Sequence, residues 1–314
     1  ANSNQVNELG VFVVDDDQGT INGIAPGAEN YAQVALSRTK AIFSVIADTP
    51  NGFNTDLTRL LEFNSGERLR FFLVNNSSID AVQAGSTSLT DVLFSNPSTQ
   101  KVTDLGNGEF TLSFNDASNN NTSDLQDLVV KIKATNQPLP LGAGLQGNPF
   151  GELIDLRDVS TQVKAEFVLH REASNDNFVG FYQIADTNGG IDIDGNGTVD
   201  LRPGDAGYAQ AAVQRRVPGI DLTVDNQSTA TFTANLSPGS VLAPFIIANG
   251  RPEAILDGNS NNDPAVYFSF LGANSDKVDH IRLLGNNTFG FEDLANGGDK
   301  DYNDMIVRVN LSNA

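Results

Sequence analysis

Short apolar stretches recur along the chain and are separated by runs rich in Gly, Asn, Asp and Ser. Alternating or β-branched content favours strands in these stretches. The expected strands span residues 9–14, 41–46, 69–74, 110–114, 128–132, 163–170, 178–184, 241–247, 265–270 and 305–309. Only "YAQVALSR" from Tyr31 and "YAQAAVQRR" from Tyr208 have the pattern of short helices. Many short strands joined by turns predict an all-β fold.

Two parts of the chain carry the same landmarks in the same order. "NELGVFVVDDDQG" from Asn7 matches "NFVGFYQIADTNG" from Asn177, and "PGAENYAQVAL" from Pro26 matches "PGDAGYAQAAV" from Pro203. "FNDASNNNTSDLQDLVV" from Phe114 aligns without gaps on "FEDLANGGDKDYNDMIV" from Phe291. The offset between the copies grows by seven positions after the first landmark, so the second copy holds a short insertion there. A repeated order of landmarks indicates a tandem duplication.

The segment between the two copies is rich in Pro and Gly and has no apolar period, which is typical of a linker. We therefore expect a first repeat over residues 1–133, a linker over 134–160 and a second repeat over 161–314. Each repeat is expected to form one β-sandwich or jelly-roll-like domain.

The balance of charge limits the classes of partner. The formal charge is −20, from 19 Lys and Arg against 39 Asp and Glu. No run of basic residues could follow a phosphate backbone, so nucleic acids and anionic membranes are poor partners and a cation is a better one. The absence of Cys removes disulfides, zinc-thiolate sites and thiol catalysis. No apolar stretch is long enough to span a bilayer, so direct membrane insertion is not expected.

The insertion in the second copy falls within "DIDGNGTVD", the strongest local motif. Ca²⁺ takes six to eight oxygen ligands, which such a loop supplies at alternate positions around a sharp Gly turn. The candidate ligands are Asp192, Asp194, Asn196, Thr198 and Asp200. Pro203 occupies the place of the bidentate Glu of an EF-hand, so we expect Asp186 or Asp205 as substitutes. The alternative is a solvated Asx-Gly turn that binds no ion.

A second acidic segment, "FEDLANGGDKDYNDMIV", runs directly into an apolar strand. Gly297 and Gly298 allow the chain to fold back so that its acidic ends approach each other. The candidate ligands are Glu292, Asp293, Asp299, Asp301, Asn303 and Asp304. Like charges this close repel, and a bound Ca²⁺ would offset the repulsion. The alternative is a charged hairpin tip without an ion.

The pairing of "VGFYQI…PGDAGYAQAAV" with the terminal "FGFEDLANGGDKDYNDMIVRV" resembles an uncharacterised domain family of secreted bacterial proteins that is common in cyanobacteria. The resemblance covers residues 177–311 well and 7–133 more loosely. Members often accompany RTX-type calcium-binding repeats or cell-surface anchoring segments. The resemblance implies an extracellular or cell-surface β domain that binds calcium and has no family-wide enzymatic activity.

The first copy departs from this pattern at the acidic segment. Three of the candidate positions carry uncharged residues, namely Asn115, Thr122 and Gln126. Asp116, Asp124 and Asp127 remain, and Asp16 with its acidic neighbours is a further weak candidate. Fewer carboxylates attract calcium less strongly, so this site is either of low affinity or lost. The acidic run around Asp16 is equally consistent with a solvated turn.

Catalytic patterns are lacking. His170 and His280 each stand alone in a strand-like context, which favours ordinary surface or interface histidines. We expect a non-enzymatic extracellular structural protein, stabilised by Ca²⁺, that suits a homo-oligomer or assembly into a sheath, surface layer or filament. A calcium-dependent adhesion or carbohydrate-binding module, with a glycan as partner, is the first alternative. A secreted hydrolase that uses paired carboxylates is the second.

Overall fold

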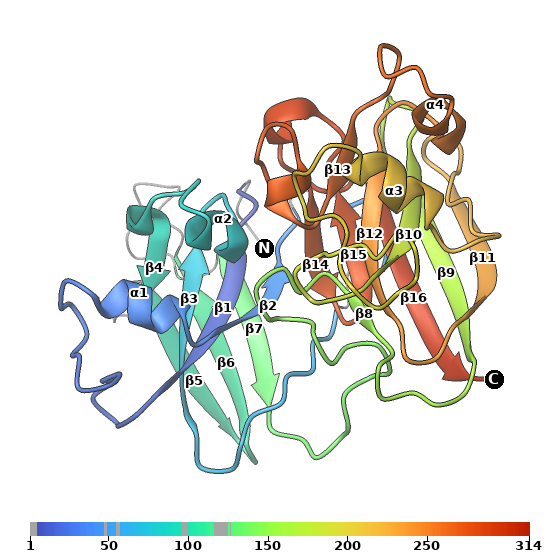
Figure 1. Cartoon of the computed structure of the whole chain (residues 1–314). Coiled ribbons are helices and arrows are strands. Elements are labelled where there is room, and N and C mark those ends of the chain that lie inside the picture. Colours follow the sequence, from blue (N-terminus) through green and yellow to red (C-terminus); the bar gives the residue numbers. More distant parts are fainter. Residues whose placement is uncertain (1–4, 47–48, 55–56, 96–98, 116–124, 126) are drawn as a thin grey trace. The chain divides into compact units, whose positions relative to one another are not determined.

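The computed structural model describes residues 5–46, 49–54, 57–95, 99–115, 125 and 127–314. The chain forms two compact units (Figure 1). Unit 1 comprises Ala1–Ala47 and Leu61–Leu139, and unit 2 comprises Asp48–Leu60 and Pro140–Ala314. Antiparallel sheets dominate both units, so the all-β prediction is confirmed. In the described ranges, no helix combines the length and the apolar character needed to cross a bilayer.

Unit 1 contains a four-stranded sheet in the order β2-β1-β3-β4 and a three-stranded sheet in the order β5-β6-β7. The strands are β1 (Glu8–Val14), β2 (Thr39–Ser44), β3 (Arg68–Val74), β4 (Val92–Phe94), β5 (Gln100–Gly106), β6 (Glu109–Phe114) and β7 (Leu128–Lys133). The helices are α1 (Tyr31–Leu36), α2 (Ile79–Gln83) and the 3-10 turn η1 (Leu89–Asp91). One apolar cluster draws on both sheets, and a second joins the four-stranded sheet to the helices.

Unit 2 contains the sheet β10-β12-β13, with β8 also paired to β12, and the five-stranded sheet β11-β9-β16-β15-β14. The strands are β8 (Ile154–Asp155), β9 (Val163–Arg171), β10 (Phe178–Ile184), β11 (Thr229–Leu236), β12 (Val241–Ile247), β13 (Val266–Phe268), β14 (Ile281–Gly285), β15 (Thr288–Phe291) and β16 (Met305–Asn313). The helical segments are α3 (Tyr208–Gln214), α4 (Pro252–Leu256), η2 (Leu271–Ala273) and η3 (Ala295–Gly297).

Strand β12 explains how unit 2 is layered, because it is buried along its whole length. Leu242 and Ile246 belong to the apolar cluster shared with the five-stranded sheet. Ala243 and Phe245 point to the other side, into a cluster that includes Tyr208 of α3. A strand covered on both faces needs a continuous apolar run instead of an alternating one, and "VLAPFII" is such a run.

The same local arrangements occur in both units at corresponding positions of the sequence repeat. Gly10 lies opposite Phe72 across β1 and β3, and Gly180 lies opposite Phe245 across β10 and β12. In each unit the phenylalanine ring packs over the bare glycine, and a Cβ on Gly180 would lie 2.5 Å from the ring Cζ of Phe245. The last strand pair also recurs, with Phe114 opposite Leu128 and Phe291 opposite Met305.

A buried tyrosine fixes each short helix to the turn before it. Tyr31 of α1 donates its hydroxyl to the carbonyl of Gly19 at 2.7 Å, and Tyr208 of α3 donates to the carbonyl of Gly189 at 2.6 Å. Both helices predicted from "YAQ" are present, although each ends earlier than its sequence pattern suggested.

Two of the expected domain boundaries differ from the observed units. Residues 140–160 of the expected linker belong to unit 2, where β8 pairs with β12 and Leu153, Ile154 and Leu156 are 1% exposed or less. The Pro and Gly residues there make tight turns within a packed segment. Residues 48–60, expected in the first repeat, also belong to unit 2. In that segment the Phe53 ring centre lies 5.4 Å from that of His170.

The close approach at Gly180 generates a stability prediction. In Gly180→Ala the new methyl group would clash with the Phe245 ring, which is 0% exposed and has no free space to enter. We expect the free energy of unfolding of unit 2 to fall by about 1–3 kcal/mol, as measured by urea denaturation. Phe245→Leu in the same chain makes room, so the double variant should lose less than the sum of the single losses. Strictly additive losses would contradict the packing described here.

Candidate metal centre

Strand pairing brings two carboxylates of the terminal segment face to face. Phe291 ends β15 and pairs with Met305, which begins β16. Glu292 and Asp304 are the next residues outward on the two strands, so the antiparallel register places them together. Asp301 joins them, and a carboxylate oxygen of each of the three lies within 4.8 Å of the others. We call Glu292, Asp301 and Asp304 the acidic cluster.

The loop from 292 to 304 closes over the acidic cluster through tight backbone turns. Gly298 has φ +45°, and a Cβ there would lie 2.5 Å from Glu292 Oε1. Tyr302, at φ +53°, is an unusual aromatic residue in the left-handed region. Its hydroxyl donates to the Asp279 carbonyl at 2.8 Å, and the Arg282 guanidinium lies 4.0 Å from its ring centre. These contacts hold the strained turn in place.

Glu292 is the most deeply buried member of the acidic cluster, at 0% exposure. Its Oε1 accepts the backbone N–H of Leu294 at 3.1 Å. Its Oε2 is buried and accepts a hydrogen bond from none of the described residues. Arg282, whose guanidinium lies over the Tyr302 ring, is paired with Asp279 at 3.5 Å. A buried carboxylate oxygen without a donor is costly, and a bound cation is one way to satisfy it.

Burial and mutual repulsion shift the ionisation of the acidic cluster. Burial raises the pKa of Glu292 well above the ordinary carboxyl range, and the nearby Asp304 charge raises it further. Burial also raises the pKa of Asp304, with the charge of Asp293 as the next cause. The raised pKa values favour the protonated form of Glu292 and Asp304 when no cation is bound. A cation would take the place of those protons.

Asp293, although adjacent to Glu292, points to different partners. Its Oδ1 accepts from the Asn175 amide at 3.0 Å, and its Oδ2 accepts from the Asn177 amide. Its backbone N–H donates to Asp304 Oδ2 at 2.7 Å. Asp293 therefore connects the acidic cluster to residues 175–177 and positions Asp304, and it lies outside the cluster itself.

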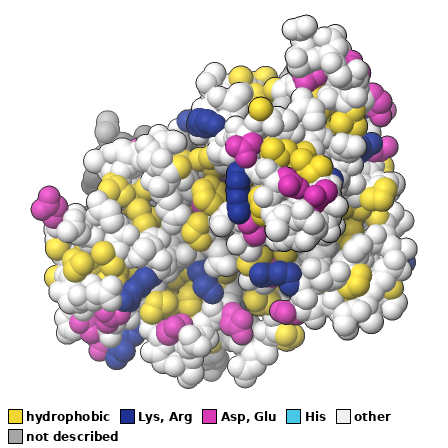
Figure 2. All heavy atoms as spheres, in the orientation of Figure 1, with side chains coloured by type: hydrophobic (Ala, Val, Ile, Leu, Met, Phe, Trp, Pro, Cys, Tyr) yellow, Lys and Arg dark blue, Asp and Glu magenta, His cyan; other side chains and the backbone are white. Residues whose placement is uncertain are grey.

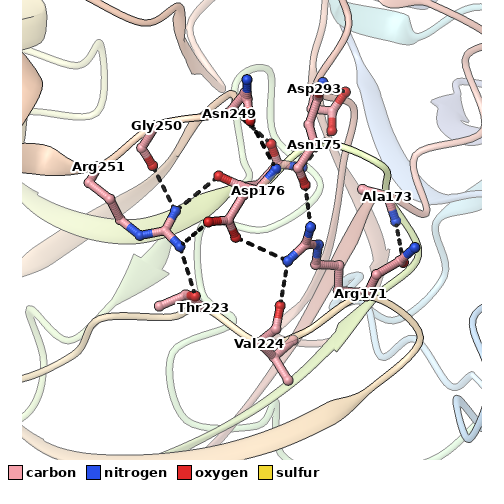
Figure 3. A network of polar contacts seen from close by, with 12 residues as sticks. Arg171, Ala173, Asn175, Asp176, Thr223, Val224, Asn249, Gly250, Arg251 and Asp293 are labelled. Carbon is pink, nitrogen blue, oxygen red and sulfur yellow. Dashed lines mark hydrogen bonds and ion pairs between the residues drawn. The ribbon is translucent and has the colours of Figure 1, made fainter.

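Two arginines hold the turn that presents Asn175 to Asp293 (Figure 3). Arg171, which is 6% exposed, donates to the Asn175 carbonyl at 2.6 Å and pairs with Asp176 at 3.1 Å. Arg251 pairs with the other oxygen of Asp176 at 2.7 Å. The turn is thereby fixed from both sides, which keeps the amide of Asn175 aimed at the carboxylate of Asp293.

Both histidines are buried, contrary to the expectation of ordinary surface or interface residues. His280 is 0% exposed and stacks on Tyr267, with 3.6 Å between ring centres. Its Nδ1 lies 2.9 Å from the Glu292 carbonyl oxygen, and its Nε2 lies 3.0 Å from Asp276 Oδ2. His170 is 8% exposed and bonds to Thr229 Oγ1 at 2.9 Å. His280 thus fixes the backbone of Glu292 through the contact between its Nδ1 and the Glu292 carbonyl oxygen.

A polar pocket of about 450 Å³ opens beside the acidic cluster. Its walls come from the 292–304 loop, from the residues after β9 and from Thr49. The loop contributes Asp293, Leu294, Asp299, Asp301, Asn303 and Asp304. Glu292 is not part of the wall.

Figure 2 shows Lys and Arg side chains as separate patches on the face in view, without a continuous basic area.

Glu172 is a pocket residue that sequence reasoning missed. It follows β9, whose Arg171 pairs with Met305 of β16, and its N–H donates to the Asp304 carbonyl at 3.1 Å. The strand register therefore brings Glu172 beside Asp304. No short-range pattern marks Glu172 in the sequence, because the two strands lie far apart along the chain.

The "DIDGNGTVD" loop forms a second acidic group. Carboxylate oxygens of Asp192, Asp194 and Asp200 lie within 4.8 Å of one another, and the group is half-buried to exposed. Asp192 accepts two backbone N–H groups of the loop, at 2.7 and 2.8 Å, and the second of these is the main cause that lowers its pKa. Asn196 Oδ1 accepts the backbone N–H of Thr198 at 2.8 Å. These bonds form a network of Asx turns.

The proposed substitutes for the missing twelfth ligand are not members of this group. Asp186 pairs with Arg202 at 2.6 Å through Oδ2, and its Oδ1 accepts two backbone N–H groups. Asp205 Oδ2 accepts the backbone N–H of Arg202 at 2.7 Å. The two carboxylates thus fix the Arg202 turn.

The weaker candidates of unit 1 do not gather in this way. Asp16 accepts the backbone N–H of Thr20 at 2.9 Å within its own turn, and Asp127 is 4% exposed. Asp116 and Asp124 lie outside the described residues. Within the part of unit 1 that the structure describes, no three acidic side chains form a group like the acidic cluster.

Residues 236–312 match the sequence profile of a domain of unknown function, DUF4114. The match begins at the end of β11 and includes the whole 292–304 loop with the acidic cluster. It supports the expected resemblance to an uncharacterised domain family, over less than half of the chain. No curated protein and no solved structure matches the chain.

The raised pKa values predict how stability depends on pH without metal. The unfolded chain releases its carboxyl protons near pH 4, whereas Glu292 and Asp304 of the folded chain retain theirs to higher pH. The retained protons stabilise the folded state fully below about pH 4, and this stabilisation is lost as the pH rises through the raised pKa values. In chelator, we expect the melting temperature of the native protein to fall relative to that of Glu292→Gln between pH 5 and pH 8. A constant difference would show that Glu292 is ionised throughout.

Proposed function

We propose that unit 2 is a calcium-binding β domain whose terminal loop is held closed by the ion. The single observation that carries the proposal is the buried Oε2 of Glu292, which lacks a hydrogen-bond donor among the described residues, on a side chain that brings a carboxylate oxygen within 4.8 Å of two further carboxylates. Oxygen-only donors favour a hard cation. Oxygens that share one Ca²⁺ lie at most about 5 Å apart, since each Ca–O distance is about 2.3–2.6 Å, and the 4.8 Å limit of the cluster fits this.

The pocket supplies what the acidic cluster lacks. Three carboxylates do not by themselves fill the six to eight positions of calcium. Asp299, Asn303 and Glu172 line the adjoining pocket with further oxygens, and water can complete the shell. The "DIDGNGTVD" loop is proposed as a second, more exposed calcium site of lower affinity, because its carboxylates already accept backbone N–H groups.

The biological role that follows is structural. We propose a non-enzymatic protein of the cell surface or the extracellular space, built from two tandem β-sandwich or jelly-roll-like repeats and suited to assembly. A site with a dissociation constant on the order of 10⁻⁵ M, in calcium near 10⁻³ M, would stabilise the folded state by about 2.7 kcal/mol. A hydrolase is less well supported, because Glu292 is fully buried and does not line the pocket that a substrate would enter.

Calcium-dependent glycan binding is a second candidate, and the pocket favours it. The opening beside Asp301 and Asp304 would leave calcium positions open to sugar hydroxyls. A glycan array probed with the chain should then show signals in calcium that disappear in chelator. An array without calcium-dependent signals would remove this candidate and leave the structural role unaffected.

Thermal melting tests the calcium site. We expect calcium, and not magnesium at equal concentration, to raise the melting temperature by about 5–10 °C. Asp301→Asn should abolish most of this rise. Glu292→Gln should do the same and also raise the melting temperature in chelator, since it removes one buried carboxyl group from the acidic cluster.

Two further variants complete the design. Asp225→Asn changes an exposed carboxylate of the same unit and should leave the calcium response intact. Asp194→Asn should reduce the response only slightly if the exposed loop is the weaker site. Equal melting of the native protein in calcium and in chelator at neutral pH would refute the proposal.

A further inference from the structure

The pocket beside the acidic cluster carries carboxylates that the cluster itself does not use. Glu172 and Asp299 line the pocket, but neither belongs to the group whose oxygens lie within 4.8 Å of one another. Within the described ranges, neither side chain has a hydrogen-bond or ion-pair partner. An ion centred on the acidic cluster therefore leaves both carboxylates available to a molecule in the pocket.

The pocket stays negative after such an ion is bound. Glu292 lies behind the wall, and five carboxylates line it, namely those of Glu172, Asp293, Asp299, Asp301 and Asp304. No Lys or Arg is among the described residues of the wall. Six negative charges against the two positive charges of Ca²⁺ leave a formal charge of −4. A ligand that is itself a carboxylate or a phosphate would be repelled.

The ligand has two tasks in this pocket, and few chemical groups perform both. It must offer oxygen to the open positions of the ion, and it must donate hydrogen to Glu172 and Asp299, since ionised carboxylates only accept. An ammonium group donates hydrogen but has no oxygen for the ion. A carboxylate offers oxygen but donates no hydrogen when ionised. An uncharged hydroxyl group performs both tasks, because its oxygen has lone pairs and carries one hydrogen.

A sugar ring presents hydroxyl groups in the form that suits the pocket best. Neighbouring hydroxyls on a ring have a fixed separation, so the ring loses less conformational entropy on binding than an open-chain polyol. The pocket volume of about 450 Å³ lies within the range of small-molecule sites, about 300–1,000 Å³. Leu294 is the one large apolar side chain among the described wall residues and is 47% exposed, so it offers a contact for the C–H face of the ring.

We propose that the pocket binds uncharged sugars and rejects acidic ones. Two neighbouring ring hydroxyls coordinate the ion, and further hydroxyls donate to Glu172 and Asp299. The inference rests on the proposed calcium site, and it specifies the class of glycan that the site takes. Water completes the coordination of the ion when the pocket holds no sugar.

A glycan array printed with matched pairs tests this selectivity. Each pair differs only at the sixth carbon of the terminal sugar, with glucose against glucuronate, galactose against galacturonate and mannose against mannuronate. In calcium, at least one pair should give a signal for the neutral member that is about tenfold or more above that of the acidic member. The signal should disappear in chelator, because the sugar binds through the ion.

Two variants examine the roles of the wall residues. Glu172→Gln keeps the size of the side chain but removes its charge, so it should weaken the neutral signal and narrow the gap to the acidic member. Leu294→Ala should weaken the neutral signal by about threefold to tenfold, while calcium still raises the melting temperature. Asp225→Asn, an exposed carboxylate outside the pocket wall, is the matched control and should leave the array pattern unchanged.

The opposite results are equally clear. Acidic members that bind as strongly as their neutral partners, or sugar signals that persist in chelator, would overturn the inference. An array without signals, from protein whose melting temperature rises in calcium, would overturn it and leave the calcium site standing. A melting temperature that does not respond to calcium would instead remove the proposed function on which the inference rests.

Discussion

The structure of unit 2 depends on the burial of one carboxylate at the end of a strand pair. Antiparallel pairing of β15 with β16 places Glu292 and Asp304 next to each other at the end of the two strands. The loop that joins them brings a carboxylate oxygen of Asp301 within 4.8 Å of theirs. Water is excluded from Glu292, so neither solvent nor a described donor satisfies its Oε2. The three carboxyl groups must share protons or a cation.

Several contacts in unit 2 fix the backbone and side chains around the buried Glu292. His280 supports the backbone of Glu292, and Tyr302 anchors the returning chain. Asn175 holds Asp293, and Arg171 and Arg251 fix the turn that carries Asn175. A loop whose own charges repel is therefore surrounded by rigid hydrogen-bonded contacts. This preorganisation would reduce the conformational cost of closing the loop around the proposed ion.

Local sequence patterns predicted the strands that have apolar cores of their own, such as β10 and β12, whose observed bounds agree with the expected ranges. They missed β11, although its sequence TATFTANL alternates polar and apolar residues, and its apolar side is only partly buried. The terminal motif indicated the residues of the acidic cluster, but it could not separate Glu292 from Asp293. Their side chains diverge because neighbours in an extended chain point to opposite sides. Glu172 enters the site only through the long-range register of β9 with β16.

The most direct measurement is a crystal structure determined from protein grown in calcium, with anomalous data to identify the ion. The account predicts an ion within about 2.3–2.6 Å of Glu292 Oε2 and of carboxylate oxygens of Asp301 and Asp304. A structure at saturating calcium in which Glu292 instead shares a proton with Asp304, with no ion between them, would contradict it.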